Sequence, residues 1–242
     1  MNLEQFSNAF DTQVNSYAFS PQYGDEATKQ TLAFDEYEKS LWLSNAQEQL
    51  VVSLYNGRNN IAGSFEETEE MRRYLANLVE EARIFPIENS TGTPIGMEST
   101  STFFTLPDDL WFITYEAIDI DGWKCGGTKS IEVVPATQDE YHRLKKNPFR
   151  GPNDRRALRL DLSEGVIEIV SKYTVLDYYV RYLKKIKPII LIDLPDGLSI
   201  NGETVATECE LHESLHQKIL DLAVGLAVQS KGYNRLSNNS DN

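Results

Sequence analysis

The chain of 242 residues carries 37 acidic against 23 basic side chains, a formal net charge of −14 at pH 7, and 40% of its residues are hydrophobic. This composition is typical of a globular protein with a packed core, and so acidic a surface disfavours non-specific binding to nucleic acid or to an anionic membrane. Only two cysteines, Cys125 and Cys209, are present, which excludes a disulfide scaffold. The first residues lack the pattern of a secretory signal, and no apolar run reaches the ~20 residues that span a bilayer. We therefore expect the protein to be made in an aqueous cytoplasm and to stay there.

Residues 1–32 are polar with scattered aromatic side chains and fit neither a clean helix nor a clean strand. One interpretation is an N-terminal arm that docks onto its own domain or onto a neighbouring protein. The other is a short helix folded back onto its own core. The aromatic side chains that either contact would use are Phe6, Phe10, Tyr17, Phe19 and Tyr23.

Two helices are predicted next, over residues 35–56 and 65–83, from apolar side chains that recur at helical spacing. Ser64 and Glu67 have the spacing of a capping box, and acidic residues fill the first turns of the second helix, where the helix dipole favours them. Turn-forming residues then dominate residues 89–101, which predicts a loop.

β-branched and aromatic residues dominate the middle of the chain, which predicts a sheet of mainly antiparallel strands. A second capping box, Thr137 with Glu140, begins a helix that stops before Asn147-Pro148. Ser163-Glu164-Gly165 predicts a hairpin between its two flanking strands. The expected strands are Thr102–Leu106, Leu110–Ile120, Ser130–Val134, Ala157–Leu162, Val166–Val170 and Val175–Ile192, the last of them broken by Pro188.

The last element is predicted to be a helix over residues 211–231, because five apolar side chains share one face: Leu211, Leu215, Ile219, Leu222 and Leu226. Helices, then strands, then a helix is the order of an α+β fold. We expect an arm over 1–32, one α+β domain over 33–232 and a polar tail over 233–242. The expected parts of the domain are a helical part (33–88), a β-rich part (100–195) and the C-terminal helix packed on the sheet.

His212-Glu213-Ser214-Leu215-His216 matches the H-E-x-x-H pattern of zinc hydrolases, in which two histidines bind the metal and the glutamate acts as general base. A catalytic zinc needs a third protein ligand. No histidine follows His216, and of the later carboxylates Asp221 is too near on the same helix while Asp241 lies in the tail. Because this third ligand is missing, we expect no metal, no cofactor and no catalytic residue. A zinc hydrolase that uses residues 212–216 is kept only as an alternative.

Three other patterns have both a structural and a functional interpretation. Cys125, with His142 downstream, matches a cysteine nucleophile, but Gly126-Gly127 predicts a turn there. Asp108-Asp109 follows a proline and is interpreted as a turn or a helix cap. Residues 143–187 are rich in Lys and Arg, which is typical of a nucleic-acid-binding module or of a protein contact surface.

Charge is segregated along the sequence. Residues 139–190 contain 12 basic and 7 acidic side chains, whereas residues 1–90 contain 6 basic and 15 acidic ones. Contact between acidic and basic parts of different copies would explain the basic segment without nucleic acid, because complementary charge fixes register and speeds encounter.

Six stretches of the sequence form a recognisable pattern when they are taken together: Phe34–Leu43, Phe65–Glu70, Leu106–Leu110, Asp139–Pro152, Tyr178–Pro188 and the helix Cys209–Ala227. In their order and composition they resemble a structural protein of crAss-like and related gut phages, and head-to-tail adaptor proteins of short-tailed phages more broadly. The resemblance covers residues 33–230.

The resemblance implies a virion structural protein, a ring-forming subunit of the head–tail connector or tail, assembled in the host cytoplasm. Its implied partners are itself, as a dodecamer around a DNA channel, and the portal or other tail ring proteins. DNA would pass through the lumen without specific binding, and no membrane is involved. The resemblance implies that a histidine like His216 recurs in that family, that one like His212 is typically absent, and that no catalytic residue carries over.

Overall fold

The computed structural model describes residues 1–18, 33–57, 69–87, 98, 101–123 and 126–230. These residues form two compact units. The helical unit combines both ends of the chain, Met1–Leu78 and Ile186–Asn242, and the sheet unit is the continuous segment Val79–Lys185. The helical unit holds 9 basic and 20 acidic residues, a net charge of −11, whereas the sheet unit holds 14 and 17, a net charge of −3. The single domain expected over 33–232 stays a prediction. The observed division is into these two units.

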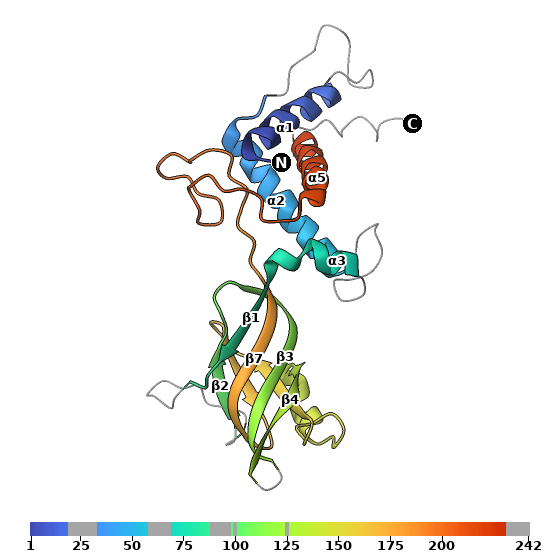
Figure 1. Cartoon of the computed structure of the whole chain (residues 1–242), viewed down its shortest axis with the longest axis vertical. Coiled ribbons are helices and arrows are strands. Elements are labelled where there is room, and N and C mark those ends of the chain that lie inside the picture. Colours follow the sequence, from blue (N-terminus) through green and yellow to red (C-terminus); the bar gives the residue numbers. More distant parts are fainter. Residues whose placement is uncertain (19–32, 58–68, 88–97, 99–100, 124–125, 231–242) are drawn as a thin grey trace. The chain divides into compact units, whose positions relative to one another are not determined.

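The helical unit is built around α2, which both α1 and α5 contact (Figure 1). Asp35 caps α2 by accepting a hydrogen bond from the Glu38 backbone, and the Glu38 side chain accepts one in return from the Asp35 backbone. The elements of the unit are α1 (Leu3–Ala18), α2 (Glu36–Tyr55), α3 (Glu69–Tyr74), η3 (Ala76–Leu78), η4 (Glu213–Leu215) and α5 (His216–Ser230).

Helix α1 is folded back onto its own unit, which was one of the two interpretations of residues 1–32. Phe6, Phe10 and Val14 recur every four positions and are completely buried. The Lys39 ammonium of α2 adds a polar link, with 2.7 Å to Asp11 of α1 and 2.9 Å to Glu36. Phe19 and Tyr23 lie outside the described residues.

The buried face of α5 differs from the predicted one. Leu222 is 40% exposed, and Ala223, Val224 and Ala227 are buried in its neighbourhood instead. The predicted Leu211, Leu215 and Ile219 are buried, so the predicted stripe is correct up to the second turn of α5 and departs from the buried face after it. The apolar face of α5 contacts α1 and α2 within the helical unit. Packing of α5 on the sheet stays a prediction.

The described residues of the sheet unit form one sheet of seven strands in the order β1-β7-β3-β4-β5-β6-β2. Every pair is antiparallel except β4 with β5, which are parallel and joined through α4. The strong twist of the strands is visible in Figure 1. The elements are β1 (Val79–Ile84), β2 (Ser101–Thr105), β3 (Leu110–Trp123), β4 (Gly127–Ala136), α4 (Gln138–Lys145), β5 (Arg156–Asp161), β6 (Val166–Val170) and β7 (Thr174–Lys184).

Two predicted boundaries are wrong. Val79–Ile84 is strand β1 and not the end of a helix, because it pairs along β7 from Tyr178 to Leu183. This long-range pairing overrides a local helical pattern. Strand β7 ends at Lys184, a few residues before the predicted break at Pro188, which has no backbone N–H for a ladder, and the strand does not resume up to Ile192. The capping box at Ser64 lies outside the described residues, as does most of the loop at 89–101.

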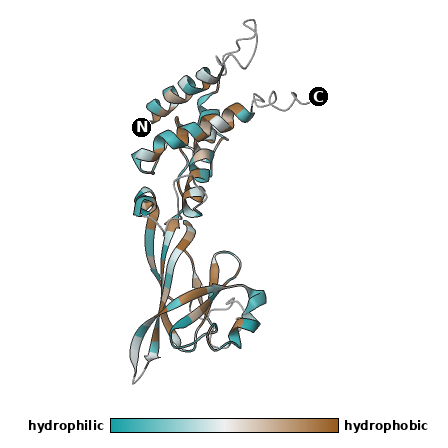
Figure 2. Ribbon diagram, turned by 90° about the vertical axis from the view of Figure 1, so that its right-hand side faces the viewer, coloured by the Kyte–Doolittle hydropathy of each residue, from teal (hydrophilic) through white to brown (hydrophobic). Residues whose placement is uncertain are grey.

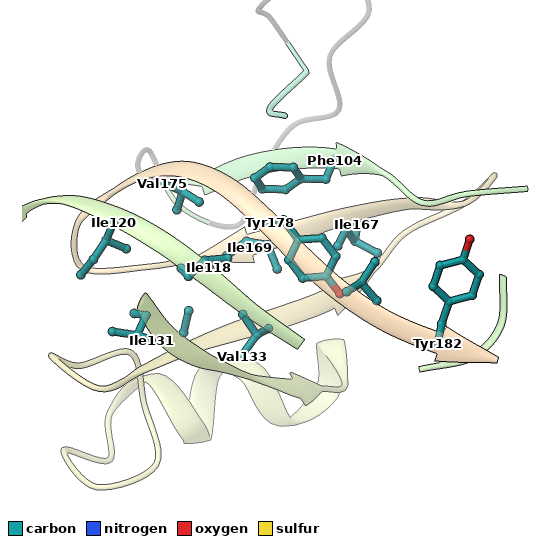
Figure 3. Packing of buried hydrophobic residues seen from close by; sticks show 12 residues of the cluster. Phe104, Ile118, Ile120, Ile131, Val133, Ile167, Ile169, Val175, Tyr178 and Tyr182 are labelled. Atoms are coloured by element: carbon teal, nitrogen blue, oxygen red, sulfur yellow. The ribbon is translucent and has the colours of Figure 1, made fainter. Parts of the chain in front are cut away.

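The core of the sheet unit lies on the concave side of the curled sheet, where side chains from most strands meet (Figure 3). Phe104 of β2 and Tyr178 of β7 come from distant places in the strand order, yet their ring centroids are 5.5 Å apart. The backbone N–H of Ile87, just after β1, donates to Phe103 on β2 over 2.8 Å. The sheet is therefore curled far enough to bring its two edges together.

Elements of both units carry hydrophilic and hydrophobic residues, as expected where one face is buried and the other exposed (Figure 2). Among the described helices, none combines the length and the hydropathy that crossing a bilayer requires.

Candidate assembly surfaces

The two histidines of the H-E-x-x-H pattern have different structural roles. His212 is exposed and precedes η4 as its N-cap, where its Nδ1 accepts from the Ser214 backbone N–H over 3.3 Å. His216 is buried and begins α5. A zinc pair needs both histidines one turn apart on a regular helix, and the cap with its 3-10 turn breaks that spacing.

Both ring nitrogens of His216 already have protein partners. Nδ1 lies 2.6 Å from the ammonium of Met1, and Nε2 lies 3.2 Å from the Leu211 carbonyl oxygen. The ring packs on Phe6, with a centroid distance of 5.3 Å. Burial is the main cause that lowers the pKa of His216, so the neutral ring is favoured. His216 therefore joins α1 to α5, and within the described residues no three His, Cys, Asp or Glu side chains gather as a metal-ligand set.

The other candidate residues, where they lie in the described part of the chain, have environments that indicate a structural role. Burial raises the pKa of the Cys209 thiol to about 11, which keeps it protonated and unreactive. Asp109 accepts a hydrogen bond from the Tyr182 hydroxyl over 3.1 Å in the turn before β3. His142 is exposed on α4, whereas Cys125 lies outside the described residues.

A buried ionic cluster, which the sequence analysis missed, lies inside the sheet unit. Glu116 of β3 accepts from the Arg159 guanidinium over 2.9 Å and from the Tyr178 hydroxyl over 2.8 Å. Burial raises the pKa of the Glu116 carboxyl, and Arg159 partly offsets this. The only sequence signal was an acidic and a basic residue at positions that alternate with core residues. The cluster is structural, since its charges are paired within the core.

The basic segment 143–187 does not form one surface, because many of its charges are already paired. Arg159 is in the core, and Arg181 and Lys184 form ion pairs with acidic residues of β1. Five exposed cations of this segment form no ion pair with the described residues: Lys146, Arg150, Arg155, Lys185 and Lys187. The first three lie after α4, in the stretch from its last turn to the start of β5, residues 142–156, which we call the basic loop.

The basic loop has a fixed backbone. The Asn147 side-chain oxygen accepts from the backbone N–H groups of Phe149 and Arg150, over 2.9 and 3.2 Å. The Asn147 carbonyl accepts from the Gly151 N–H over 2.7 Å. Phe149 is nevertheless 85% exposed. The loop thus presents a large apolar side chain among six Lys and Arg residues and one carboxylate, Asp154.

Residues 188–210 of the helical unit have the opposite character, and we call them the acidic loop. They contain five acidic residues and no Lys or Arg. The loop lies beside α2 and buries Ile190, Leu194 and Ile200 against Tyr37 and Leu41 (Figure 1).

Backbone hydrogen bonds also order the acidic loop. Ile190 and Thr207 exchange two of them, and the Leu194 N–H donates to Thr204 over 2.8 Å. Ile192 and Val205 remain 49% and 61% exposed. The sequence signal that could have revealed this surface is the absence of Lys and Arg from Pro188 to Gln217.

Ordered loops of opposite charge, each with exposed apolar side chains, are features of proteins that assemble through specific contacts. The chain belongs to a family of phage tail ring proteins, since the model of the family described as phage tail ring protein 3/4 matches residues 1–240. It is 47% identical over 234 residues to ring protein 3 of Bacteroides phage crAss001, covering 96% of each chain. It is 30% identical over 236 residues to ring protein 4/5 of the same phage, covering 94% of this chain and 92% of the relative.

The expected resemblance to structural ring proteins of crAss-like phages is therefore confirmed. The chain is a virion structural protein of the phage tail. The match extends through both the helical unit and the sheet unit. The similarity to the family therefore covers nearly the whole chain and does not rest on a single motif.

Proposed function

We propose that copies of this chain form a closed ring, a dodecamer, that surrounds the path of the DNA in the tail or at the head–tail interface. The observation that carries the proposal is the match to tail ring proteins along nearly the whole chain. Its neighbours in the stack are other tail ring proteins or the portal. That one phage has two relatives of this chain supports rings of related subunits stacked on one another.

The charge distribution suits a DNA conduit. The helical unit has a net charge of −11, and acidic surfaces along a lumen repel phosphates, so that passing DNA does not stick. The basic loop then faces a neighbouring subunit and not the DNA. Assembly takes place in the host cytoplasm before the finished virion is released.

The role is structural and not catalytic. The family is named for a ring, and the two histidines of the H-E-x-x-H pattern serve as a helix cap and as a packing link between α1 and α5. This supports a protein that acts by its shape and its contacts.

Electron microscopy tests the proposal directly. Purified full-length protein at high concentration, and intact virions labelled with an antibody against the chain, are imaged and averaged. Rings in the first sample and label on the tail in the second are expected. Absence of the chain from virions would refute the proposed function, and rings of another copy number would refute the dodecamer alone.

A further inference from the structure

We propose that the basic loop of one copy docks onto the acidic loop of the next copy, so that these two loops form the contact that closes the ring. This inference rests on the proposed function and specifies its interface. A closed ring requires two different, mutually complementary surfaces on each subunit, because every copy contacts one neighbour with each of them. The basic loop lies in the sheet unit and the acidic loop in the helical unit.

The first argument is charge. Within the described part of the chain, Lys146, Arg150 and Arg155 have no anionic partner, although the protein has 14 more acidic than basic residues. The acidic loop supplies exposed carboxylates, Asp196 and Glu203 among them, with no cation in its own sequence. Complementary potentials of this kind give a contact its specificity and its register.

The second argument is apolar area. Phe149 is 85% exposed on the basic loop, and Val205 and Ile192 are 61% and 49% exposed on the acidic loop. Aromatic side chains surrounded by polar residues are the usual anchors of protein interfaces. Each loop therefore carries both exposed apolar and exposed charged side chains, and the charges of the two loops have opposite signs.

The third argument is rigidity. Asn147 holds the backbone on both sides of Phe149, and the Asp193 side chain accepts from the Ala206 N–H over 2.8 Å to fix the acidic loop. Loops without regular secondary structure lose conformational freedom when they bind, and this cost is lower when they are already ordered. Phe149 is thus held exposed on a backbone that is already ordered.

Two charge-reversed variants of the full chain test the contact. The first carries Lys146→Glu and Arg150→Glu on the basic loop, and the second carries Asp196→Lys and Glu203→Lys on the acidic loop. In each variant alone, the two loops that should meet in the contact carry charge of the same sign and repel each other. Self-association measured by sedimentation velocity should therefore weaken by about tenfold or more.

A mixture of the two variants in equal amounts is the decisive sample. Each reversed loop then meets a reversed partner and each native loop meets a native one, so association should return to within about threefold of the parent chain. Misfolded variants would not recover on mixing. Phe149→Ser should weaken association of an otherwise native chain, and the mixture of charge variants should lose its recovery when both carry it.

A control separates the contact from a general effect of net charge. Arg73→Glu with Lys218→Glu shifts the net charge as much as the first variant does, but both residues belong to the helical unit outside the acidic loop. This control should associate like the parent chain. Equal weakening in the control, or no recovery in the mixture, would overturn the inference.

The result stays distinguishable from a failure of the proposed function. If the parent chain forms rings and the charge-reversed variants associate as well as the parent, the ring proposal stands. The two loops would then contact other partners. A parent chain that stays monomeric at every concentration would contradict self-docking of the loops. Microscopy of virions would still decide independently whether the chain forms a ring in the tail.

Discussion

Single residues in this chain illustrate how a motif can match in sequence and differ in structure. His212 and His216 are four positions apart, but one is an exposed cap and the other a buried link. His216 has Met1 on one ring nitrogen, Leu211 on the other and the Phe6 ring beside it. Its role is therefore to hold α1 against the start of α5, and this role depends on its protonation state.

The pH dependence of stability follows from that burial. The folded-state pKa of His216 is lowered by burial, so its contribution to stability is present above the unfolded pKa of about 6.5 and is lost as pH falls through the folded pKa. Urea unfolding of the parent protein from pH 7 downwards should therefore show a loss that a His216→Gln variant shows to a smaller extent.

The matched control for this prediction is His212→Gln, which removes the exposed histidine of the same pattern. Its unfolding free energy should depend on pH as steeply as that of the parent. If the parent and His216→Gln lose stability in parallel over the same pH range, His216 is not the titrating group.

Gly151 is a second residue whose role is purely steric. A Cβ on Gly151 would lie 2.9 Å from the carbonyl oxygens of both Leu144 and Asn147, at the end of α4. Gly225, in contrast, lies within α5 with nothing within 4 Å of a Cβ. The same substitution should thus have opposite effects at the two positions.

Gly151→Ala is expected to destabilise the protein by about 1–3 kcal/mol, because backbone carbonyl groups must move to make room. Gly225→Ala is expected to stabilise it by about 0.5–1 kcal/mol, because alanine favours the helix. Chemical denaturation of both variants checks the pair. A Gly151→Ala variant as stable as the parent would show that the basic loop is less rigidly held than its hydrogen bonds indicate.

At the scale of the elements, neighbours decided what each segment became. Val79–Ile84 follows two short helical pieces and has helical spacing of apolar residues, yet it forms the edge strand β1 on β7. The two strands that flank Ser163-Glu164-Gly165 form the predicted hairpin, with Glu164 and Gly165 at φ of 58° and 72°. Local turn chemistry fixed the hairpin, whereas a partner about a hundred residues away fixed β1.

For the whole molecule, the two units differ in whether one continuous segment of the chain is enough to form them. All seven strands and the core cluster of the sheet unit come from the continuous segment Val79–Lys185. The helical unit needs both ends of the chain, because α5 contacts α1 and α2 across the sequence of the entire sheet unit.

Residues 79–185 expressed alone should therefore fold, since the strand pairings and the core cluster lie within this segment and its size is within the usual domain range. Circular dichroism should give a β-rich spectrum, and heating should give one cooperative transition. Residues 1–78 alone are the control and should not unfold cooperatively, because α5 no longer covers α1 and α2. A 79–185 fragment without cooperative unfolding would show that the sheet unit depends on the helical unit.

The sequence by itself determined the class of fold, most strand positions and the type of protein. Alternation in the strands, the hairpin turn and the helix of α2 with its cap are local signals, and local signals can be recognised one segment at a time. The resemblance to structural ring proteins of crAss-like phages was also contained in the sequence, and the family match confirms it.

Only the tertiary structure decided which surfaces are free. It showed that Arg159 is paired in the core, that Arg181 and Lys184 are paired with acidic residues of β1, and that Phe149 is exposed in the basic loop. It also placed α5 on α1 and α2. The physical reason is that spacing along a chain reveals which face of an element is buried, but the partner that buries it is set by contacts between residues far apart in sequence.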